Sequence, residues 1–453
     1  MQISIITLTA IIAFLSAIVI TGFARNLSKY FNVLIDIPDK SRKFHFRPTP
    51  LIGGISIHLG MLLGLMSLFL IGDIKFSSVN GDLETLKTNI TVLEEKYSDF
   101  SVTLSPTKSS NYLNQDSSYS IEINGIDQVI DVVKNNNDTF GVSLDGLKYS
   151  DFSFIDNVVV NINDKSESAL IDSSANSFFE FTWFALVLIC VSLCFQCLML
   201  LDDWFGLKHW IKFLIQMSAS ATIILLTDLY VSDLGLGLLG LNMDLGIWGI
   251  PFTILAVTGI TNAFNMIDGI DGLCSGIALI GFTFLALIAG NQNVTYSLLI
   301  AIFALLGFMI YNLGLFGKKR RVFLGDHGSN FLGFIIAWTC ISFASSDNVL
   351  MQPVTALWIV AIPLLDSLMV MAQRGRMGLE AFEADRTHIH FLLVDKLNFS
   401  QTSVLSILIC CSLVLALIGY VMNVNGFTNN FSFVVFIIVS SLLIFGKNAL
   451  QKL

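Results

Sequence analysis

The sequence predicts an all-α polytopic membrane protein with about eleven transmembrane helices and a small α+β extracytoplasmic insertion. Hydrophobic residues make up 54% of the 453 residues and charged residues only 13%, whereas soluble globular proteins carry about 25% charged residues. Several apolar runs reach about 18 residues, long enough to cross a hydrocarbon core about 30 Å thick. One segment, 73–178, differs from the rest because it is strongly acidic. These three observations predict the fold class.

Each apolar run is expected to be a helix, because a bilayer offers no water to the backbone hydrogen-bonding groups. The predicted spans are 3–23, 51–72, 179–201, 209–228, 246–264, 272–290, 295–313, 329–346, 351–372, 402–423 and 431–446. The first is not expected to be a cleaved signal peptide, because its positive charges follow it. The chain therefore divides into a first membrane part (1–72), an inserted domain (73–178) and a second membrane part (179–453).

The Lys and Arg residues predict the orientation. Seven of the 25 lie within 73–178. All the others fall in loops and ends that the predicted spans place on one side, beginning with the loop after the first span. Under the positive-inside rule, the N-terminus is outside and the C-terminus is cytoplasmic.

The segment 73–178 carries 17 Asp and Glu against seven Lys, so it accounts for the negative charge of the chain. Its apolar residues recur at helical spacing over 83–93 and alternate as in half-buried strands over 119–123 and near 158–160. A small α+β domain on the outer face is the favoured interpretation, and a disordered acidic linker is the alternative. None of the seven cysteines lies in it, so no disulfide is expected there.

Ionisable residues at membrane depth are costly, so their positions carry information. The first cytoplasmic loop holds Lys43 and His45 before a Pro-Thr-Pro sequence and the pair Gly53-Gly54. Tight backbone beside cations suits a phosphate, although a plain topology signal is the alternative. The third span ends in Asp202-Asp203, with Lys212 following. In such a pair, one carboxylate can act as a general base, or both can attract Mg²⁺. The alternative is that the acidic pair only marks a membrane boundary.

The fifth span leads into Asn262, Asn265, Asp268 and Asp271. Their three-residue steps put them on one face if the helix continues, and such oxygen ligands suit a hard cation with a phosphate substrate. A purely structural role is disfavoured, because burying four polar side chains in an apolar protein is costly.

Two further motifs follow the seventh and ninth spans. In Gly325-Asp326-His327-Gly328, backbone N–H groups at a helix start could hold an anion and the carboxylate a metal. The second motif, 385–390, contains Arg386, His388 and His390. A zinc pair is an alternative there, but no thiolate or third histidine adjoins it, so contact with a diphosphate is favoured.

With these five motifs in this order, the membrane part resembles the polyprenyl-phosphate N-acetylhexosamine-1-phosphate transferases of glycosyltransferase family 4. The first loop and the stretch 385–390 are more similar to the branch that uses UDP-GlcNAc than to phospho-MurNAc-pentapeptide translocase. The resemblance implies an enzyme of the bacterial inner membrane. It would transfer GlcNAc-1-phosphate from UDP-GlcNAc to undecaprenyl phosphate and release UMP, with Mg²⁺, or alternatively Mn²⁺, as cofactor.

The resemblance also implies residue roles. Asp326 and Asn265 would bind the metal. Asp202 would deprotonate or position the lipid phosphate, with Asp203 and Lys212 close by. The remaining residues would bind the nucleotide sugar and its diphosphate: Lys43, His45, Asn262, Asp268, Asp271, Arg386, His388 and His390.

The sequence departs from the family at Phe391, where a further histidine is usual, and in the long insertion. Another UDP-N-acetylhexosamine, such as a 6-deoxy sugar or MurNAc-pentapeptide, is the alternative donor. An ion-coupled transporter is disfavoured, because the acids gather at one face rather than at the midplane of related halves. A surface receptor that uses the membrane part only as an anchor is also disfavoured, because one or two spans would suffice for it. A homodimer is left open, and no nucleic acid partner is expected.

Overall fold

The computed structural model describes residues 2–38, 47–71, 102–106, 118–123, 129–134, 140–144, 147–148, 158–162, 165–169, 174–238, 241–289, 292–345, 349–378 and 386–452. The chain forms two compact units. The first contains Met1–Asp73 and Ala185–Leu453, and the second contains Ile74–Phe184.

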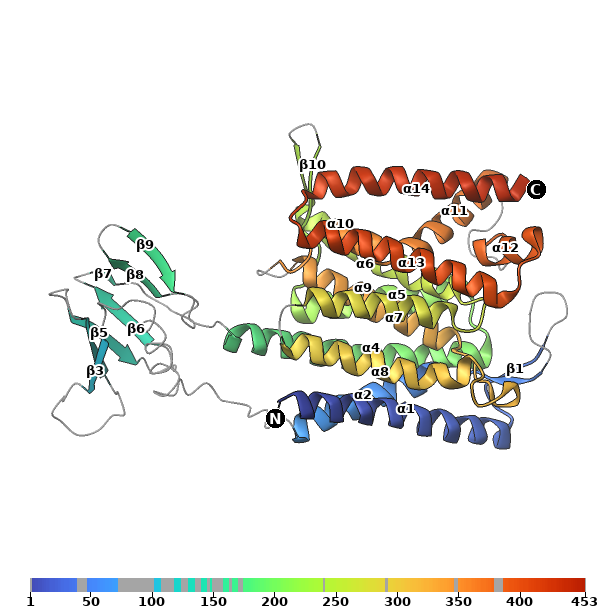
Figure 1. Ribbon diagram of the computed structural model, residues 1–453, viewed down its shortest axis with the longest axis horizontal. Coiled ribbons are helices and arrows are strands. Elements are labelled where there is room, and N and C mark those ends of the chain that lie inside the picture. The colour runs from blue at the N-terminus through green and yellow to red at the C-terminus, as the bar shows by residue number, and fades with distance from the viewer. Residues whose placement is uncertain are drawn as a thin grey trace. The chain divides into compact units, whose positions relative to one another are not determined.

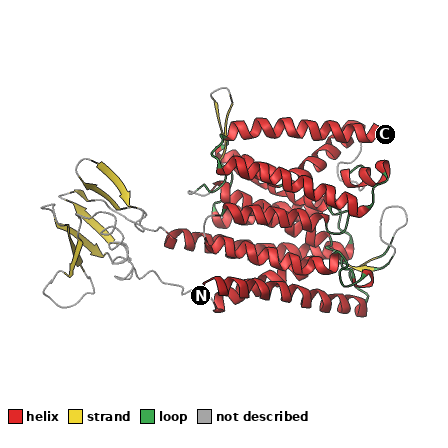
Figure 2. Ribbon diagram, viewed as in Figure 1, coloured by secondary structure: helices red, strands yellow, loops and turns green. Residues whose placement is uncertain are grey.

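The first unit is built from apolar helices, among them the part of α4 from Ala185 onwards (Figures 1 and 2). They are α1 (Gln2–Phe31), α2 (Gly53–Ile71), α4 (Ser174–Phe205), α5 (His209–Thr227), α6 (Gly249–Ile267), α7 (Leu273–Ile288), α8 (Gln292–Asn312), α9 (Asp326–Ser345), α10 (Pro353–Ile359), α11 (Ala361–Met377), α12 (Ile389–Leu397), α13 (Gln401–Val424) and α14 (Asn429–Lys452). Two short hairpins join them: β1 (Ile35–Asp36) with β2 (Thr49–Pro50), and β10 (Asp233–Leu238) with β11 (Leu241–Asp244).

Helices occupy all eleven predicted ranges. Within the described residues, eight helices are long and apolar enough to cross a membrane, or nine if the bent pair α10–α11 is one span. The segments Gly53–Leu68 and Leu273–Ile288 are apolar but shorter. The chain is therefore a multi-pass membrane protein, and the count of eleven spans stays a prediction.

Two boundaries differ from the prediction. Helix α1 continues to Phe31, eight residues past the predicted end at 23, because nothing in the polar sequence that follows breaks a helix. The ninth predicted span is broken at Val360, where α10 and α11 meet at an angle of 82°. Pro363 lacks the N–H that would bond to the carbonyl of Ile359, so one straight helix cannot pass through this point.

Helix α9 lies in the core of the first unit. Its candidate span is 83% buried, and it packs against α2, α6, α7 and α10. Its apolar residues surround the helix, as expected for a helix enclosed by others. This position fixes the beginning of α9, where Asp326 lies, between the ends of its neighbours.

The crossing of α2 and α9 depends on two glycines. A Cβ built on Gly54 would lie 2.4 Å from the Cα of Gly328, closer than two carbon atoms can approach. We expect Gly54→Ala to lower the free energy of unfolding by about 1–3 kcal/mol, because the two helices must separate. Gly259→Ala is the matched control, since nothing lies within 4 Å of its Cβ position. Equal melting temperatures for both variants in detergent would contradict the expected contact.

The second unit contains strands. A five-stranded antiparallel sheet has the order β3-β4-β5-β6-β7, and β8 pairs with β9. Their bounds are Val102–Pro106, Ser118–Ile123, Val129–Lys134, Phe140–Leu144, Leu147–Lys148, Val158–Ile162 and Lys165–Ala169. The strands predicted over 119–123 and near 158–160 are confirmed as β4 and β8. The helix predicted over 83–93 falls outside the described residues, so the α+β character and the outer-face location stay predictions.

Candidate active site

The predicted motifs meet where α4, α6 and α8 end and where α5, α7 and α9 begin. A cavity of about 340 Å³ opens there. Five carboxylates and one guanidinium line it, together with apolar, amide and glycine residues: Asp36, Asp203, Asp268, Asp271, Asp326 and Arg321. A cavity with so many charged groups suits a charged substrate or a cation.

Lys212 joins two of the acidic motifs. Its Nζ lies 2.5 Å from Oδ2 of Asp202 and 3.1 Å from Oδ2 of Asp326. The side chain of Asp202 is only 2% exposed, whereas that of Asp326 is 45% exposed. Asp202 also accepts a hydrogen bond from the backbone N–H of Leu207. Asp202 is therefore placed to hold Lys212, while the carboxylate of Asp326 faces the cavity.

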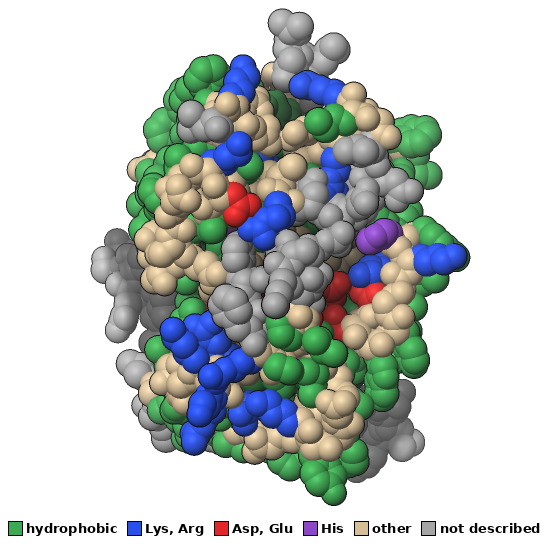
Figure 3. Space-filling model, turned by 90° about the vertical axis from the view of Figure 1, so that its right-hand side faces the viewer, with side chains coloured by type: hydrophobic (Ala, Val, Ile, Leu, Met, Phe, Trp, Pro, Cys, Tyr) green, Lys and Arg blue, Asp and Glu red, His purple; other side chains and the backbone are tan. Residues whose placement is uncertain are grey.

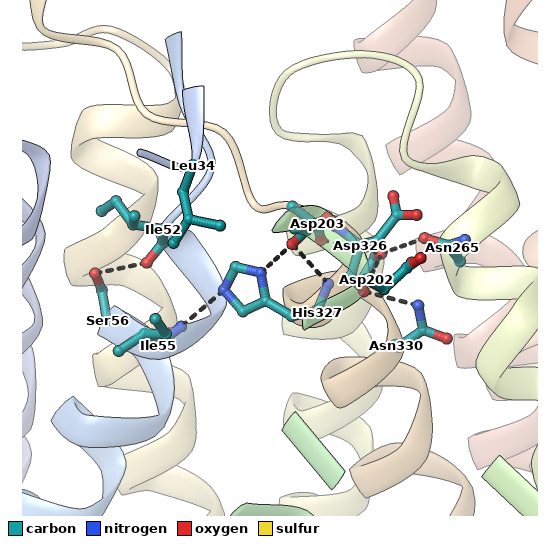
Figure 4. A network of polar contacts seen from close by, with 12 residues as sticks. Leu34, Ile52, Ile55, Ser56, Asp202, Asp203, Asn265, Asp326, His327 and Asn330 are labelled. Atoms are coloured by element: carbon teal, nitrogen blue, oxygen red, sulfur yellow. Dashed lines mark hydrogen bonds and ion pairs between the residues drawn. The ribbon is translucent and has the colours of Figure 1, made fainter. Parts of the chain in front are cut away.

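Asp203 caps the N-terminus of α9 (Figure 4). Its carboxylate accepts the backbone N–H groups of Asp326 and His327, at 3.0 and 3.2 Å. It also lies 2.5 Å from Nδ1 of His327. Nε2 of His327 accepts the N–H of Ile55, so the neutral ring must carry its proton on Nδ1 and donate it to Asp203. This chain of contacts links α4, α9 and α2 directly behind Asp326.

The first loop approaches the same place through its backbone. Phe323 donates its N–H to the carbonyl of Pro50, and Gly53 and Gly54 donate to the carbonyls of Phe323 and Leu324. The Pro-Thr-Pro and Gly-Gly motif therefore holds the strand-like segment that leads into Asp326. Lys43 and His45, predicted to bind the nucleotide sugar and its diphosphate, lie outside the described residues.

The motif after the fifth span is only partly helical. Helix α6 ends at Ile267, so Asn262 and Asn265 lie in its last turns, while Asp268 and Asp271 lie in the turn that follows. The predicted common helix face is therefore wrong for the two aspartates. Gly272, with a φ of 83°, allows the chain to turn here, and both carboxylates line the cavity.

Amide side chains connect this motif to α9. Oδ1 of Asn265 accepts a hydrogen bond of 2.8 Å from the hydroxyl of Ser329. Asn262 donates to Gln216, Gln216 donates to Asn330, and Asn330 donates to the backbone carbonyl of Asp326. Gln216 and Asn330 are buried, and the sequence-based prediction did not include them. The sequence did contain a sign of both residues, because each is a polar residue inside an apolar helix.

The charge in the cavity is unbalanced. Burial raises the pKa of Asp268 well above its usual range, and the negative charges of Asp326, Asp271 and Asp203 raise it further. Asp271 is offset by Arg321, whose Nη1 lies 2.6 Å from its Oδ2. Within the described residues, no three His, Cys, Asp or Glu side chains converge to hold a metal alone. Mg²⁺ usually takes one or two carboxylates and completes its shell with water and substrate phosphates, so the donors present fit this ion.

The histidine motif is held by residues that the sequence-based prediction missed. Nδ1 of His388 lies 2.7 Å from Oδ2 of Asp366. Oδ1 of Asp366 lies 2.6 Å from Nζ of Lys447 and accepts the N–H of Ile389. Both Asp366 and Lys447 are only 2% exposed. Asp366 is a charged residue inside a predicted span, which was the available signal.

The structure places the predicted diphosphate ligands beside the cavity rather than in its wall. Arg386 forms a two-point contact with Asp395 and lies 4.6 Å above the ring of Phe391. His390 is fully buried, and a Cβ on Gly269 would lie 2.0 Å from its Nε2. Phe391, the residue that follows this motif, does line the cavity. Diphosphate binding by Arg386, His388 and His390 stays a prediction.

The buried His390 predicts an acid-sensitive stability. Burial lowers its pKa to about 3, which outweighs the opposing influence of Asp366; His388, Lys447 and Arg386 lower it further. The folded protein therefore binds fewer protons than the unfolded chain between about pH 6.5 and pH 3, so stability falls as the pH falls through this range.

We expect His390→Gln to weaken this pH dependence by up to about 1.4 kcal/mol per pH unit, because the amide does not titrate. Melting temperatures measured from neutral to acidic pH test this. His209→Gln is the control, since His209 is exposed at the start of α5. Parallel pH profiles for the wild type and both variants would refute the expectation.

The sequence is similar to known proteins over the region that contains most of these motifs. The sequence profile described as glycosyl transferase family 4 matches residues 185–344, which contain the motifs from Asp202 to Asp326. The chain is 33% identical over 246 residues to an undecaprenyl-phosphate alpha-N-acetylglucosaminyl 1-phosphate transferase of Escherichia coli O157:H7. The alignment covers 54% of this chain and 67% of that protein.

Proteins with the same name give similar matches. The one from Escherichia coli K12 is 34% identical over 230 residues, covering 50% of this chain and 62% of the relative. The one from Haemophilus influenzae is 34% identical over 199 residues, covering 43% and 56%. The chain thus spans between about half and two thirds of the length of these relatives. From the profile match, the identity to the first relative and the order of the motifs, this chain belongs to glycosyl transferase family 4.

Proposed function

We propose that the protein transfers GlcNAc-1-phosphate from UDP-GlcNAc to undecaprenyl phosphate, giving undecaprenyl-diphosphate-GlcNAc and UMP. The observation that carries this proposal is the cavity at the helix ends, where Asp203, Asp268, Asp271 and Asp326 converge in a family 4 chain. The names of the relatives support the same donor and acceptor. In the reaction, an oxygen of the lipid phosphate forms a bond to the sugar-bearing phosphorus, and the bond from that phosphorus to UMP breaks.

Two anions must approach each other in this reaction, so the site has to offset their repulsion. Asp326, with the amide oxygen of Asn265 close to α9, would hold Mg²⁺, which supplies positive charge to the diphosphate when bound. Lys212 supplies a fixed positive charge between Asp202 and Asp326. Because Asp202 is buried against Lys212, we assign it to positioning this cation and the lipid phosphate. We favour direct attack in a single displacement.

The remaining residues orient these groups. Asp203 accepts both N–H groups at the start of α9 and so fixes the direction of Asp326. Asp268 and Asp271 shape the nucleotide-sugar pocket, with Arg321 held on Asp271. Lys43, His45, Arg386, His388 and His390 complete the substrate contacts in this proposal.

We also propose that this face is cytoplasmic, with the N-terminus outside, in the inner membrane of a bacterium. The support is the positive-inside pattern, together with the cytosolic origin of a nucleotide sugar. A lipid acceptor from the bilayer and a donor from the cytosol can meet only at such an interface. The product would be the first membrane intermediate of a cell-surface polysaccharide.

The assay uses membranes that contain the expressed protein, supplied with UDP-GlcNAc, undecaprenyl phosphate and Mg²⁺. We expect UMP release to require all three and to stop when EDTA is added. UDP-GalNAc, UDP-MurNAc-pentapeptide and a 6-deoxy donor, tested in parallel, identify the sugar. UMP release that continues without the lipid would refute the proposed transfer.

We propose that the insertion 73–178 is an accessory domain, because the described site residues all lie outside it. Replacing it with a short Gly-Ser linker is expected to leave UMP release within about twofold of the full chain, since flexible linkers tolerate such joins. The control is the amount of folded protein recovered in membranes. A folded but inactive deletion would show that the insertion takes part in catalysis.

A further inference from the structure

A second cavity, of about 410 Å³, is lined by cations. Five of its eight lining residues are basic, and none is acidic: Lys29, Arg47, Lys318, Lys319 and Arg321, with Ile35, Pro48 and Thr49. We call it the basic pocket. Figure 3 shows Lys and Arg side chains gathered on this end of the molecule. Several like charges around one hollow repel one another, and an anion bound there would relieve that repulsion.

Folding brings the walls of the basic pocket together from distant parts of the chain. Lys29 lies in the last turn of α1. The basic turn Lys318–Arg320 follows α8. Arg25 on α1 donates a hydrogen bond of 3.1 Å to the backbone carbonyl of Lys319. A hydrogen bond between two cationic segments holds the positive charges at a fixed distance, so the pocket is a defined feature of the fold.

The pocket adjoins the end of α1, a candidate membrane span. Exposed apolar residues recur every four positions along α1: Ile11, Leu15, Val19, Phe23 and Leu27. Residues four apart are offset by about 40° around a helix, so this exposed apolar row winds along α1. It reaches the last turns, where Tyr30 and Phe31 are also exposed and which carry Lys29. A ligand with a phosphate and long acyl chains would place its charge in the pocket and its chains along this row. A soluble phosphate would use only the pocket.

We propose that the basic pocket binds the headgroup of an anionic phospholipid of the surrounding bilayer. The phosphodiester lies among Lys29, Lys318 and Lys319, and the acyl chains follow α1. The basic pocket is distinct from the 340 Å³ cavity described above, which we call the carboxylate cavity. The two linings share only Arg321. The polyprenyl phosphate of the proposed reaction requires the carboxylate cavity, so it is not the assigned occupant.

Arg321 connects the two cavities. Its guanidinium contacts Asp271 in the carboxylate cavity at 2.6 Å and also borders the basic pocket. Its buried Nε has no hydrogen-bond partner within the described part of the chain. A phosphate in the basic pocket therefore competes with Asp271 for the same cation. By linkage, neutralising Asp271 strengthens binding of the phospholipid.

The experiment measures phosphatidylglycerol retained by the full chain in nanodiscs of phosphatidylcholine with phosphatidylglycerol, by native mass spectrometry. The double variant Lys318→Gln/Lys319→Gln is expected to bind about twentyfold more weakly, because each cation at an anionic surface contributes about a fivefold factor. The matched control is Lys396→Gln/Lys452→Gln, two exposed lysines on the same side. It is expected to retain phosphatidylglycerol as the wild type does.

A second pair of variants tests the connection. Asp271→Asn is expected to increase retention several-fold, whereas Asp395→Asn, with the same change of charge, is expected to leave it unchanged. If both lysine double variants lost the same amount of phosphatidylglycerol, or both aspartate variants gained the same amount, the lipid would be held by the overall charge of the protein. Either result would overturn the proposal. Displacement of phosphatidylglycerol by undecaprenyl phosphate would assign the pocket to the lipid substrate, and displacement by inorganic phosphate would assign it to a soluble anion. Retention is measured without turnover, so its outcome is independent of the proposed reaction.

Discussion

Replacing Asp326 with asparagine is expected to reduce UMP release by about a thousandfold, because an active-site cation and its ligand stabilise the transition state by several kcal/mol. The carboxylate of Asp326 is the most exposed of those described around Lys212, and it faces the carboxylate cavity. Asparagine keeps the size of the side chain but removes the negative charge. Lys212 keeps its contact with Asp202 at 2.5 Å. The loss is therefore expected in kcat, with the fold intact.

The control for this variant is Asp244→Asn, which changes the same charge at an exposed residue at the end of β11, outside the residues that line the cavity. Melting temperatures of Asp326→Asn and the wild type should agree within a few degrees, because the backbone contacts of residue 326 with Asp203 and Asn330 do not use its carboxylate. Steady-state UMP release at saturating UDP-GlcNAc gives the measurement. An Asp326→Asn protein with full activity would remove Asp326 from the proposed metal site.

Replacing Lys447 with methionine is expected to lower the free energy of unfolding by about 3–5 kcal/mol, the cost of leaving one buried charge without its partner. The ion pair with Asp366 is 2.6 Å long, and both side chains are 2% exposed. Methionine has a similar length, so packing along α14 is retained while the charge is lost. Asp366 would then be left with His388 and the N–H of Ile389.

Lys452→Met provides the matched control, because Lys452 is exposed in the last turn of the same helix. Removing both charges, in Asp366→Asn/Lys447→Met, is expected to be less destabilising than Lys447→Met alone, because no uncompensated charge remains. Unfolding in mixed micelles with increasing SDS gives the free energies. If Lys447→Met were no less stable than Lys452→Met, the buried ion pair would not hold the end of α14.

The ion pair between Asp366 and Lys447 also helps to position α12 beside the candidate active site. Asp366 holds the ring of His388 and the first N–H of α12, and α12 carries His390 and Phe391 towards the turn at Gly269. Lys447 lies on the last helix of the chain, far in sequence from this motif. Its only signal in the sequence was a positive charge near a predicted cytoplasmic end, which topology explains equally well. The contact with Asp366 could be seen only in the folded chain.

Some of the site was predictable because chemistry and local spacing are written in the sequence. The acids at the ends of predicted spans indicated one reactive face, and Asp203, Asp268, Asp271 and Asp326 do converge on one cavity. The helical continuation from Asn262 to Asp271 was wrong, because α6 ends at Ile267 and Gly272 adopts a positive φ in a turn that the three-residue spacing does not reveal. The sequence could also not distinguish Asp202, buried on Lys212, from Asp203, which caps α9.

By itself, the sequence determined the membrane character, the helices and the family. These follow from apolar runs, from the cost of unpaired backbone groups in a bilayer, and from motifs that are contiguous in the chain. The tertiary structure alone decided which charges meet. The contacts of Lys212 with Asp326, of Asp271 with Arg321 and of Asp366 with Lys447 join residues 50 to 114 positions apart. Such pairs depend on how helices pack, and helix packing is set by the shapes of many side chains together rather than by any local pattern.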